Sequence, residues 1–287
     1  MKTVTNKGER IIDFEDFDEY LAQCGKEGLG GNDRSSYDDN HKASESWDMN
    51  AGFAGAIDLS RNGWVEGMNR MAKVRSLVSL PENSNRSIQP QPVWADAGDE
   101  VDVDRYLAGE EDCMIQFVPE LTPSYGRVAK IIVNLAASCD INSDTQFRRG
   151  AAACVLIDAL EGAGVRCEVW SLPFWGSHGK TLFGARVLIK RPDEHVEPDR
   201  MAFMLAHPAV MRRFGFRLLE QQEGVWGKMS HRAYGSPADL PVEQQEEEGT
   251  IYFGRQYGCF GSDAGMIEEV SRLLAKYLEL EPEGEVA

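Results

Sequence analysis

Residues 127–176 constrain the fold of this chain more than any other stretch of the sequence. The run 128–136 is mostly apolar, the next residues are small and polar, and a long amphipathic segment leads to a second apolar run at 165–172. This order predicts a strand, a loop, a helix over 145–163 and a second strand, which is the unit of a parallel sheet. The loop would lie beyond the carboxyl end of a strand, where open α/β sheets bind their ligands.

The segments on either side extend this prediction to an α/β fold. Apolar residues alternate at 181–190, form a short run at 250–254 and recur at helical spacing over 263–280, so two more strands and a closing helix are expected. A short helix that ends at a glycine is expected at 102–109. We therefore expect residues 93–287 to form an α/β domain, with a mostly parallel, Rossmann-type sheet flanked by helices.

Residues 1–92 are expected to form an α-helical N-terminal region. Aromatic and aliphatic residues recur at helical spacing over 13–24 and over 53–77. Two polar stretches, 25–46 and 82–92, contain few large apolar residues and are predicted to be linkers.

The charge balance restricts the classes of partner. The chain has 47 acidic and 30 basic residues, for a net charge of −17. This excess disfavours general binding to nucleic acid or to an anionic membrane, because both need a cationic surface. A local basic patch is still compatible with this net negative charge.

Cysteine usage and hydropathy indicate the compartment. The six cysteines include no Cys-x-x-Cys pair and no metal-ligand spacing, which favours free thiols in a reducing cytoplasm. The opening residues are polar, so no signal peptide is expected. No apolar run approaches the ~20 residues that cross a bilayer, and no membrane partner is expected.

Oxygen-bearing side chains cluster in the predicted loop after the first strand. They suit Mg²⁺ or Ca²⁺, which prefer oxygen ligands, and are Ser138, Asp140, Asn142 and Asp144. The spacing matches the start of a calcium-binding loop, but Thr145 and Ala151 stand where that loop needs glycine and glutamate. The alternative is a capped helix start with polar turn residues. We expect no cofactor, with a metal at these four residues as the alternative.

A second predicted loop, at 173–180, would lie beside the first at the same edge of the sheet. Exposed aromatic side chains there would contact a partner, and nearby cations would add positive charge. The alternative is that the aromatic side chains pack under the loop. The candidate partner-binding residues are Phe174, Trp175, His178, Lys180, Arg148 and Arg149.

A concentration of arginines later in the chain suggests a different ligand. Arginines interleaved with phenylalanines are typical of surfaces that pair and stack with single-stranded nucleic acid. The alternative is that they pair with carboxylates of this acidic chain. The residues are Arg212, Arg213, Arg217 and Arg232.

Catalytic motifs are incomplete. Ser138 and Cys139 stand at a predicted strand end, where a nucleophile would be well placed, but no Gly-x-Ser-x-Gly elbow surrounds them. The loop over 137–147 has neither glycine nor lysine to hold a phosphate. We therefore expect a protein that is not an enzyme.

The order of elements, with the strand at 164–170, resembles a von Willebrand factor A domain. That resemblance implies an Asp-x-Ser-x-Ser magnesium site at the end of the first strand. The corresponding residues are Asn134, Ala136 and Ser138, so only the last matches and the site is expected to be weak or lost.

Four other blocks resemble an uncharacterised group of bacteriophage proteins. They lie at 63–67, 101–109, 149–152 and 207–213. The resemblance implies a phage source and a bacterial host cytoplasm, and it assigns no catalytic residue.

These observations support three functional hypotheses. The first is a noncatalytic binding or adaptor protein that contacts a host or phage protein through the loops at 137–146 and 173–180. The second is an accessory factor for phage replication or transcription that binds single-stranded nucleic acid. The third is a metal-dependent enzyme.

Overall fold

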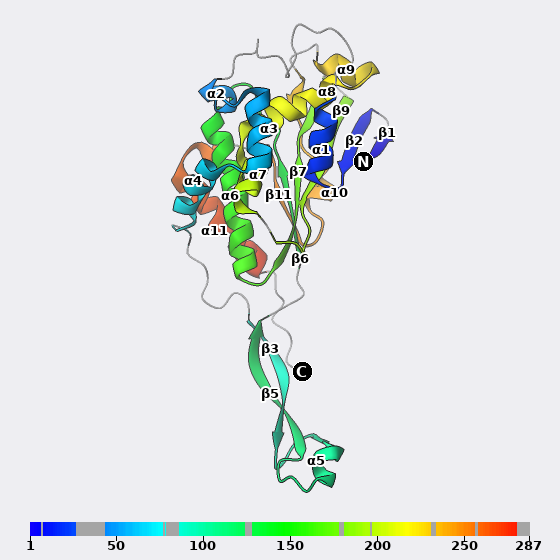
Figure 1. Cartoon of the computed structure of the whole chain (residues 1–287), viewed down its shortest axis with the longest axis vertical. Coiled ribbons are helices and arrows are strands. Elements are labelled where there is room, and N and C mark those ends of the chain that lie inside the picture. Colours follow the sequence, from blue (N-terminus) through cyan, green and yellow to red (C-terminus); the bar gives the residue numbers. More distant parts are fainter. Residues whose placement is uncertain are drawn as a thin grey trace.

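The computed structural model describes residues 1–6, 8–26, 44–76, 78, 86–123, 128–177, 181–195, 197–230, 234–255 and 258–279. The described chain forms an α/β body from which a long two-stranded arm projects (Figure 1). The expected α/β class is confirmed.

A mixed sheet forms the centre of the body. Its strands follow the order β1–β2–β9–β7–β6–β11, and β8 pairs with both β9 and β10. Their bounds are β1 Lys2–Asn6, β2 Glu9–Phe14, β6 Val128–Asn134, β7 Arg166–Leu172, β8 Phe174–Ser177, β9 Thr181–Lys190, β10 Ser236–Pro237 and β11 Thr250–Phe253.

The prediction of a mostly parallel sheet is not confirmed. β6 is parallel to β7 and β11, and β2 is parallel to β9, but β9 runs antiparallel to both β7 and β8. Only a few residues separate β8 from β9, and a connection that short joins antiparallel strands, because a parallel pair needs a long crossover.

Helices cover one face of the sheet (Figure 1). The longest, α6 (Ser143–Gly162), packs against α7 (Pro198–Ala206) and α11 (Asp263–Glu279). The other helices of the body are α1 Phe17–Cys24, α2 Glu45–Asp48, α3 Gly52–Asn62, α4 Val65–Arg75, the π-helix η1 Val210–Gly215, α8 Phe216–Glu220, α9 Gly224–Ser230, α10 Val242–Gln245 and the 3₁₀ helix η2 Gly258–Gly261.

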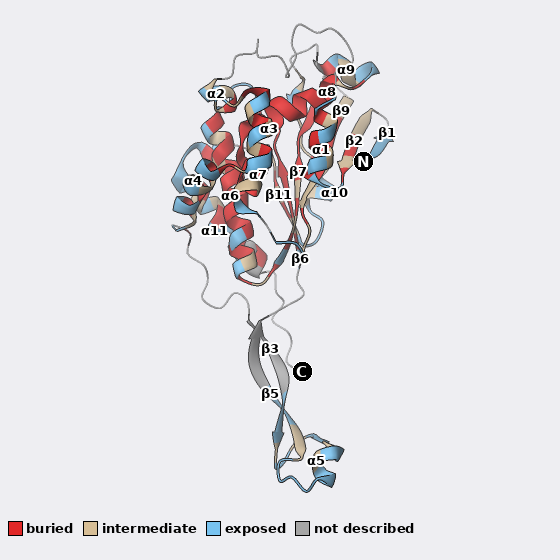
Figure 2. Ribbon diagram, in the orientation of Figure 1, coloured by how far each residue is buried: buried red, intermediate tan, exposed pale blue. Residues whose placement is uncertain are grey.

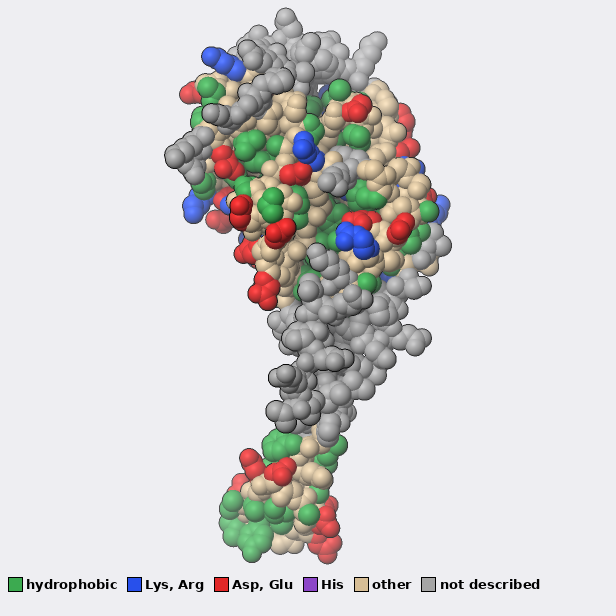
Figure 3. Space-filling model, turned by 180° about the vertical axis from the view of Figure 1, so that it is seen from behind, with side chains coloured by type: hydrophobic (Ala, Val, Ile, Leu, Met, Phe, Trp, Pro, Cys, Tyr) green, Lys and Arg blue, Asp and Glu red, His purple; other side chains and the backbone are tan. Residues whose placement is uncertain are grey.

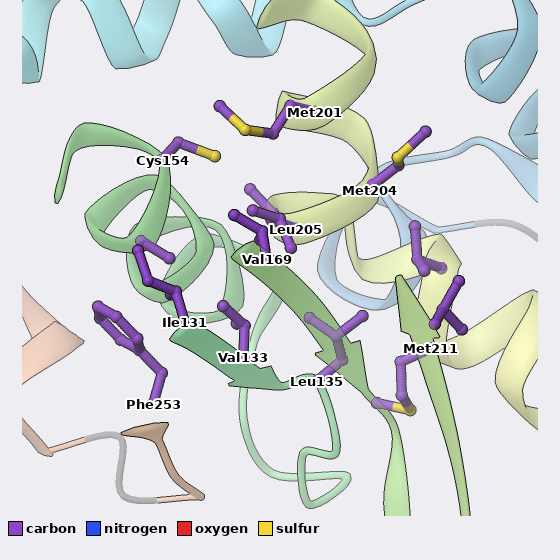
Figure 4. Close-up of a cluster of buried hydrophobic side chains, with 14 of the residues drawn as sticks. Ile131, Val133, Leu135, Cys154, Val169, Met201, Met204, Leu205, Met211 and Phe253 are labelled. Atoms are coloured by element: carbon purple, nitrogen blue, oxygen red, sulfur yellow. The ribbon is translucent and has the colours of Figure 1, made fainter. Parts of the chain in front are cut away.

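The main hydrophobic core lies between the sheet and these helices. Alternate residues of β6, Ile131 and Val133, point into it and meet Cys154 of α6 and Leu205 of α7 (Figure 4). The residue between them, Ile132, belongs to a smaller cluster on the other face of the sheet. β6 is therefore buried on both sides, which explains its nearly continuous apolar sequence.

The N-terminal region contains strands as well as helices. β1 and β2 form a hairpin, and β2 joins the main sheet beside β9. The helix expected at 13–24 begins at Phe17, because Asp16 caps it by accepting a hydrogen bond from the backbone N–H of Glu19. The first strands were not predicted. The predicted linker at 25–46 falls mostly outside the described residues.

The arm consists of β3 (Arg86–Ala95), β5 (Met114–Pro123) and, at its far end, β4 (Glu100–Val101) and α5 (Val103–Leu107). β3 and β5 pair without interruption along their whole length. The expected short helix is confirmed, but the linker predicted at 82–92 is a strand from residue 86 onward. β3 lies at an edge of its sheet, and an edge strand tolerates prolines such as Pro90 and Pro92.

None of the described helices combines the length and the hydropathy needed to cross a bilayer.

Candidate functional site

The loop after β6 is tied by hydrogen bonds to other parts of the chain. The Ser143 hydroxyl donates to the backbone carbonyl of Glu45 at 2.7 Å, which joins α2 to the start of α6. The Arg212 guanidinium donates to the carbonyl of Ile141 at 2.6 Å and also bonds the carbonyls of Ser46 and Trp47. α2 and Arg212 therefore fix the position of this loop, in which Cys139, Asp140, Asn142 and Asp144 remain exposed.

The four candidate metal ligands make separate structural contacts. Asp140 is bonded by the Ser138 hydroxyl, which lowers the pKa of its carboxyl. Asn142 caps α6 by accepting a hydrogen bond from Thr145 N–H at 2.8 Å, and Asp144 pairs with Arg70 at 3.1 Å. Among the described residues, no three His, Cys, Asp or Glu side chains form a group that could hold a metal. The capped helix start is therefore the reading that these contacts support.

Asn134 has a structural role at the end of β6. Its amide donates to the Ala238 carbonyl at 2.7 Å and to the Tyr252 hydroxyl at 3.1 Å, and its oxygen accepts from Ala136 N–H at 3.0 Å. Burial raises the pKa of Tyr252, so the phenol stays protonated. Asn134 thus links β6 to β11 and to the segment before α10.

The prediction that Phe174 and Trp175 are exposed is wrong. Both are almost completely buried, at 0% and 1% exposure. The Trp175 ring stacks on Phe183 with 6.2 Å between centroids and lies 6.0 Å from Phe216. The segment forms β8 instead of a loop, so these rings pack inside the body, as in the alternative reading. His178 and Lys180 lie outside the described residues.

The two arginines near the start of α6 are also engaged. Arg148 pairs with Asp263 of α11 at 2.8 Å. Arg149 is 2% exposed and donates to the carbonyl of Gly254 at 2.9 Å. They connect α6 to the C-terminal part of the chain and leave little cationic surface for a partner.

The prediction that the later arginines form a nucleic-acid surface is wrong for those that the structure describes. Arg212, Arg213 and Arg217 are 2%, 1% and 7% exposed. Arg213 pairs with Asp48 at 2.6 Å, and Arg217 lies 3.5 Å from Glu220. Pairing with carboxylates and carbonyls inside the body explains them. Arg232 lies outside the described residues.

A cleft of about 330 Å³ lies between α1, the end of β9 and α7. Three cations in its lining pair with carboxylates: Lys190 with Glu161, Arg191 with Glu194, and Arg200 with Asp18. These pairs neutralise the positive charge that would attract an anionic ligand.

The far end of the arm, which we call the arm tip (residues 92–118), exposes an unusual amount of apolar surface. No residue of the arm tip is buried (Figure 2). Of the fourteen large apolar residues exposed in the described chain, eight lie here: Val93, Trp94, Val101, Val103, Tyr106, Leu107, Phe117 and Val118. Apolar side chains gather at this end of the space-filling view, with acidic side chains around them (Figure 3).

A local network holds α5 on the hairpin. The Trp94 indole donates to Asp102 at 3.0 Å, and this bond and the bond from Arg105 N–H lower the pKa of the Asp102 carboxyl. The Arg105 guanidinium stacks 4.8 Å from the Trp94 ring and pairs with Glu110 at 2.5 Å. These contacts hold α5 in place within the chain itself, so its apolar residues need no partner to order them.

One face of α5 is apolar and uncovered. Val103, Tyr106 and Leu107 follow the three- and four-residue spacing of a single helix face and are 60%, 65% and 76% exposed. No described residue of the arm belongs to a hydrophobic core cluster. A contiguous apolar surface of this kind typically marks a contact site.

A protein-family model described as a domain of unknown function (DUF7192) matches residues 2–279. The chain belongs to the DUF7192 family. Neither a curated protein nor a solved structure matches it. The span of the DUF7192 match runs across the body and the arm, so the arm tip lies within the family's domain.

Sequence reasoning overlooked the arm tip of this DUF7192 chain, although two signals were present. Residues 114–118 are Met-Ile-Gln-Phe-Val, and isoleucine, phenylalanine and valine are typical strand residues. The short helix at 102–109 carries three large apolar residues within an acidic stretch, an unusual composition for a solvated loop.

Proposed function

We propose that this DUF7192 chain is a noncatalytic binding or adaptor protein that contacts a protein partner through its arm tip. The observation that carries the proposal is the concentration of eight exposed large apolar side chains on a projecting element without a buried core. A phage or host protein is the expected partner, given the predicted phage source.

The composition of the arm tip supports contact with a protein. Tryptophan, tyrosine and phenylalanine are enriched at the centres of protein interfaces. Trp94, Tyr106 and Phe117 supply one of each, and all three are exposed. The described residues of the loops at the sheet edge lack such a surface, since Phe174 and Trp175 lie inside the body.

The strand order supports a further proposal, that the body is a doubly wound domain of von Willebrand A type. Counting β6 as the first strand of this domain, the neighbours β9, β7, β6 and β11 follow the order 3-2-1-4, which begins the doubly wound order 3-2-1-4-5-6. The exposed side chains of the loop after β6, Cys139, Asp140, Asn142 and Asp144, include no large apolar residue. We therefore propose that the body carries the arm and takes no direct part in binding.

The proposal predicts that a double substitution on the arm tip removes the partner. Tyr106→Ser with Leu107→Ser should reduce the amount of partner that co-purifies with the tagged chain by about ten-fold or more, because central apolar residues carry most of the binding energy. The melting temperature should not change, since both side chains are mostly exposed. Quantitative mass spectrometry of material from the producing cells measures the loss.

A matched control removes exposed apolar residues from the body. Val225→Ser with Val242→Ser changes two side chains that are 51% and 58% exposed. This variant should keep the partner. Equal recovery of every co-purifying protein by the arm-tip variant and the parent chain would rule the proposal out.

A further inference from the structure

We infer that the partner of the arm tip presents an apolar site bordered by lysine or arginine side chains. The inference rests on the proposed function and specifies the chemistry of its partner. Residues 93–118 contain eight carboxylates and one guanidinium: Asp96, Asp99, Glu100, Asp102, Asp104, Glu110, Glu111 and Asp112, and Arg105.

The carboxylates of the arm tip are largely unneutralised. Arg105 already pairs with Glu110, and Asp102 bonds the Trp94 indole. The other six acidic side chains have no charged or hydrogen-bonding partner among the described residues. Their negative field therefore extends to whatever approaches the arm tip.

Acidic and apolar residues alternate on the same elements. Val101 of β4 follows Glu100, and Val103 of α5 precedes Asp104, so the carboxylates border the apolar surface. A charged border mainly sets the association rate and the choice of partner, while the apolar centre supplies the affinity. A basic border on the partner complements this arrangement.

The same charge argues against three other occupants. A second copy would bring two arm tips, each with a net charge of −7 over residues 93–118, into contact, and like charges across an interface are costly. Nucleic acid and anionic membranes repel the arm tip for the same reason.

Three synthetic helical peptides test the inference with the full chain. They share one tryptophan and leucine face, and their flanking positions carry lysine, glutamine or glutamate. By fluorescence anisotropy at ~50 mM salt, we expect the lysine peptide to bind about ten-fold or more tightly than the glutamine peptide, and the glutamate peptide to bind most weakly. The differences should shrink at ~0.5 M salt, where screening is strong.

Variants of the chain assign the binding to the arm tip. Neutralising Asp99, Glu100, Glu111 and Asp112 to their amides reduces the net charge of residues 93–118 from −7 to −3 and should remove most of the lysine peptide's advantage over the glutamine peptide. A control variant neutralises Glu243, Glu246 and Glu248, which are exposed on the body, and should change nothing. Tyr106→Ser with Leu107→Ser should weaken all three peptides.

Each other outcome overturns the inference. The three peptides could bind equally and still depend on Tyr106 and Leu107. This result would contradict a basic border on the partner, but it would be consistent with the proposed function. Binding of none of the peptides, or binding that only the control variant weakens, refutes the inference directly. A dimer in sedimentation that the Tyr106 and Leu107 substitutions abolish would identify a second copy as the occupant.

Discussion

Replacing Asp48 by alanine is expected to lower the free energy of unfolding by about 3–5 kcal/mol, because it breaks a buried ion pair by removing one partner. Asp48 is 0% exposed and pairs with Arg213, which is 1% exposed, at 2.6 Å. Its carboxylate also accepts backbone N–H bonds from Ser44 at 2.9 Å and Gly52 at 3.0 Å. Urea unfolding at neutral pH, followed by circular dichroism, measures the loss.

A second aspartate–arginine pair provides the control. Asp144 and Arg70 lie 3.1 Å apart, but their side chains are 58% and 37% exposed. Asp144→Ala should cost about 0–1 kcal/mol, as exposed ion pairs do. Equal costs for the two substitutions would contradict the structural role assigned to Asp48 and Arg213.

Acidification is expected to destabilise the body through His207. This side chain is 4% exposed, and burial lowers its pKa to about 4. Its Nδ1 accepts a hydrogen bond from Ala209 N–H at 3.1 Å, and its ring packs against Trp64 with 4.6 Å between centroids. These contacts favour the neutral imidazole, so the folded protein resists protonation of this residue.

The direction of this pH dependence follows from the pKa values of His207 in the unfolded and folded states. An unfolded histidine takes up a proton below about pH 6.5, while the folded protein does so only near 4. Between these values the unfolded state binds more protons, so His207 alone should remove about 3 kcal/mol as the pH falls through that window. Its contribution is fully present above pH ~6.5. Urea unfolding from about pH 4 to 8 measures the slope.

His207→Asn separates this contribution from that of the carboxylates. Asparagine can accept the same bond from the backbone two residues on, but it does not titrate. The variant should lose less stability on acidification than the parent chain. An unchanged slope in His207→Asn would exclude the assigned role.

The sequence predicted the elements around α6 well because local signals and packing agree there. The observed strands Val128–Asn134 and Arg166–Leu172 and the helix Ser143–Gly162 lie within a few residues of their predicted positions. The first strand is a nearly continuous apolar run, the second carries apolar residues at the positions that are buried, and Asn142 provides a recognisable cap. The strand Thr181–Lys190 matches its predicted bounds.

The antiparallel strands of the main sheet and the strands of the arm could not be predicted from local sequence patterns, because both depend on pairing with other segments. Residues 173–180 were predicted to be a loop, and only the pairing of Phe174–Ser177 with β9 makes this segment a strand antiparallel to β9. β3 reads as a linker because of Pro90 and Pro92, and only its pairing with β5 makes it a strand.

The predicted surface position of the candidate binding residues was wrong for a similar reason. A tryptophan or an arginine is compatible with either a surface or a buried role, and the choice depends on distant residues. Trp175 is covered by Phe216, and Arg213 is neutralised by Asp48. These aromatic and cationic side chains do bind partners, but the partners are other residues of this chain.

Site-specific photo-crosslinking in the producing cells tests the arm-tip contact most directly. A photoreactive phenylalanine analogue is placed at Tyr106 in one chain and at Val225, an exposed residue of the body, in another. We expect a discrete adduct with one protein from Tyr106, about ten-fold weaker when Leu107→Ser is added, and no such adduct from Val225. Equal adducts from both positions, or none from Tyr106 in a folded chain, would contradict the arm tip as the binding surface.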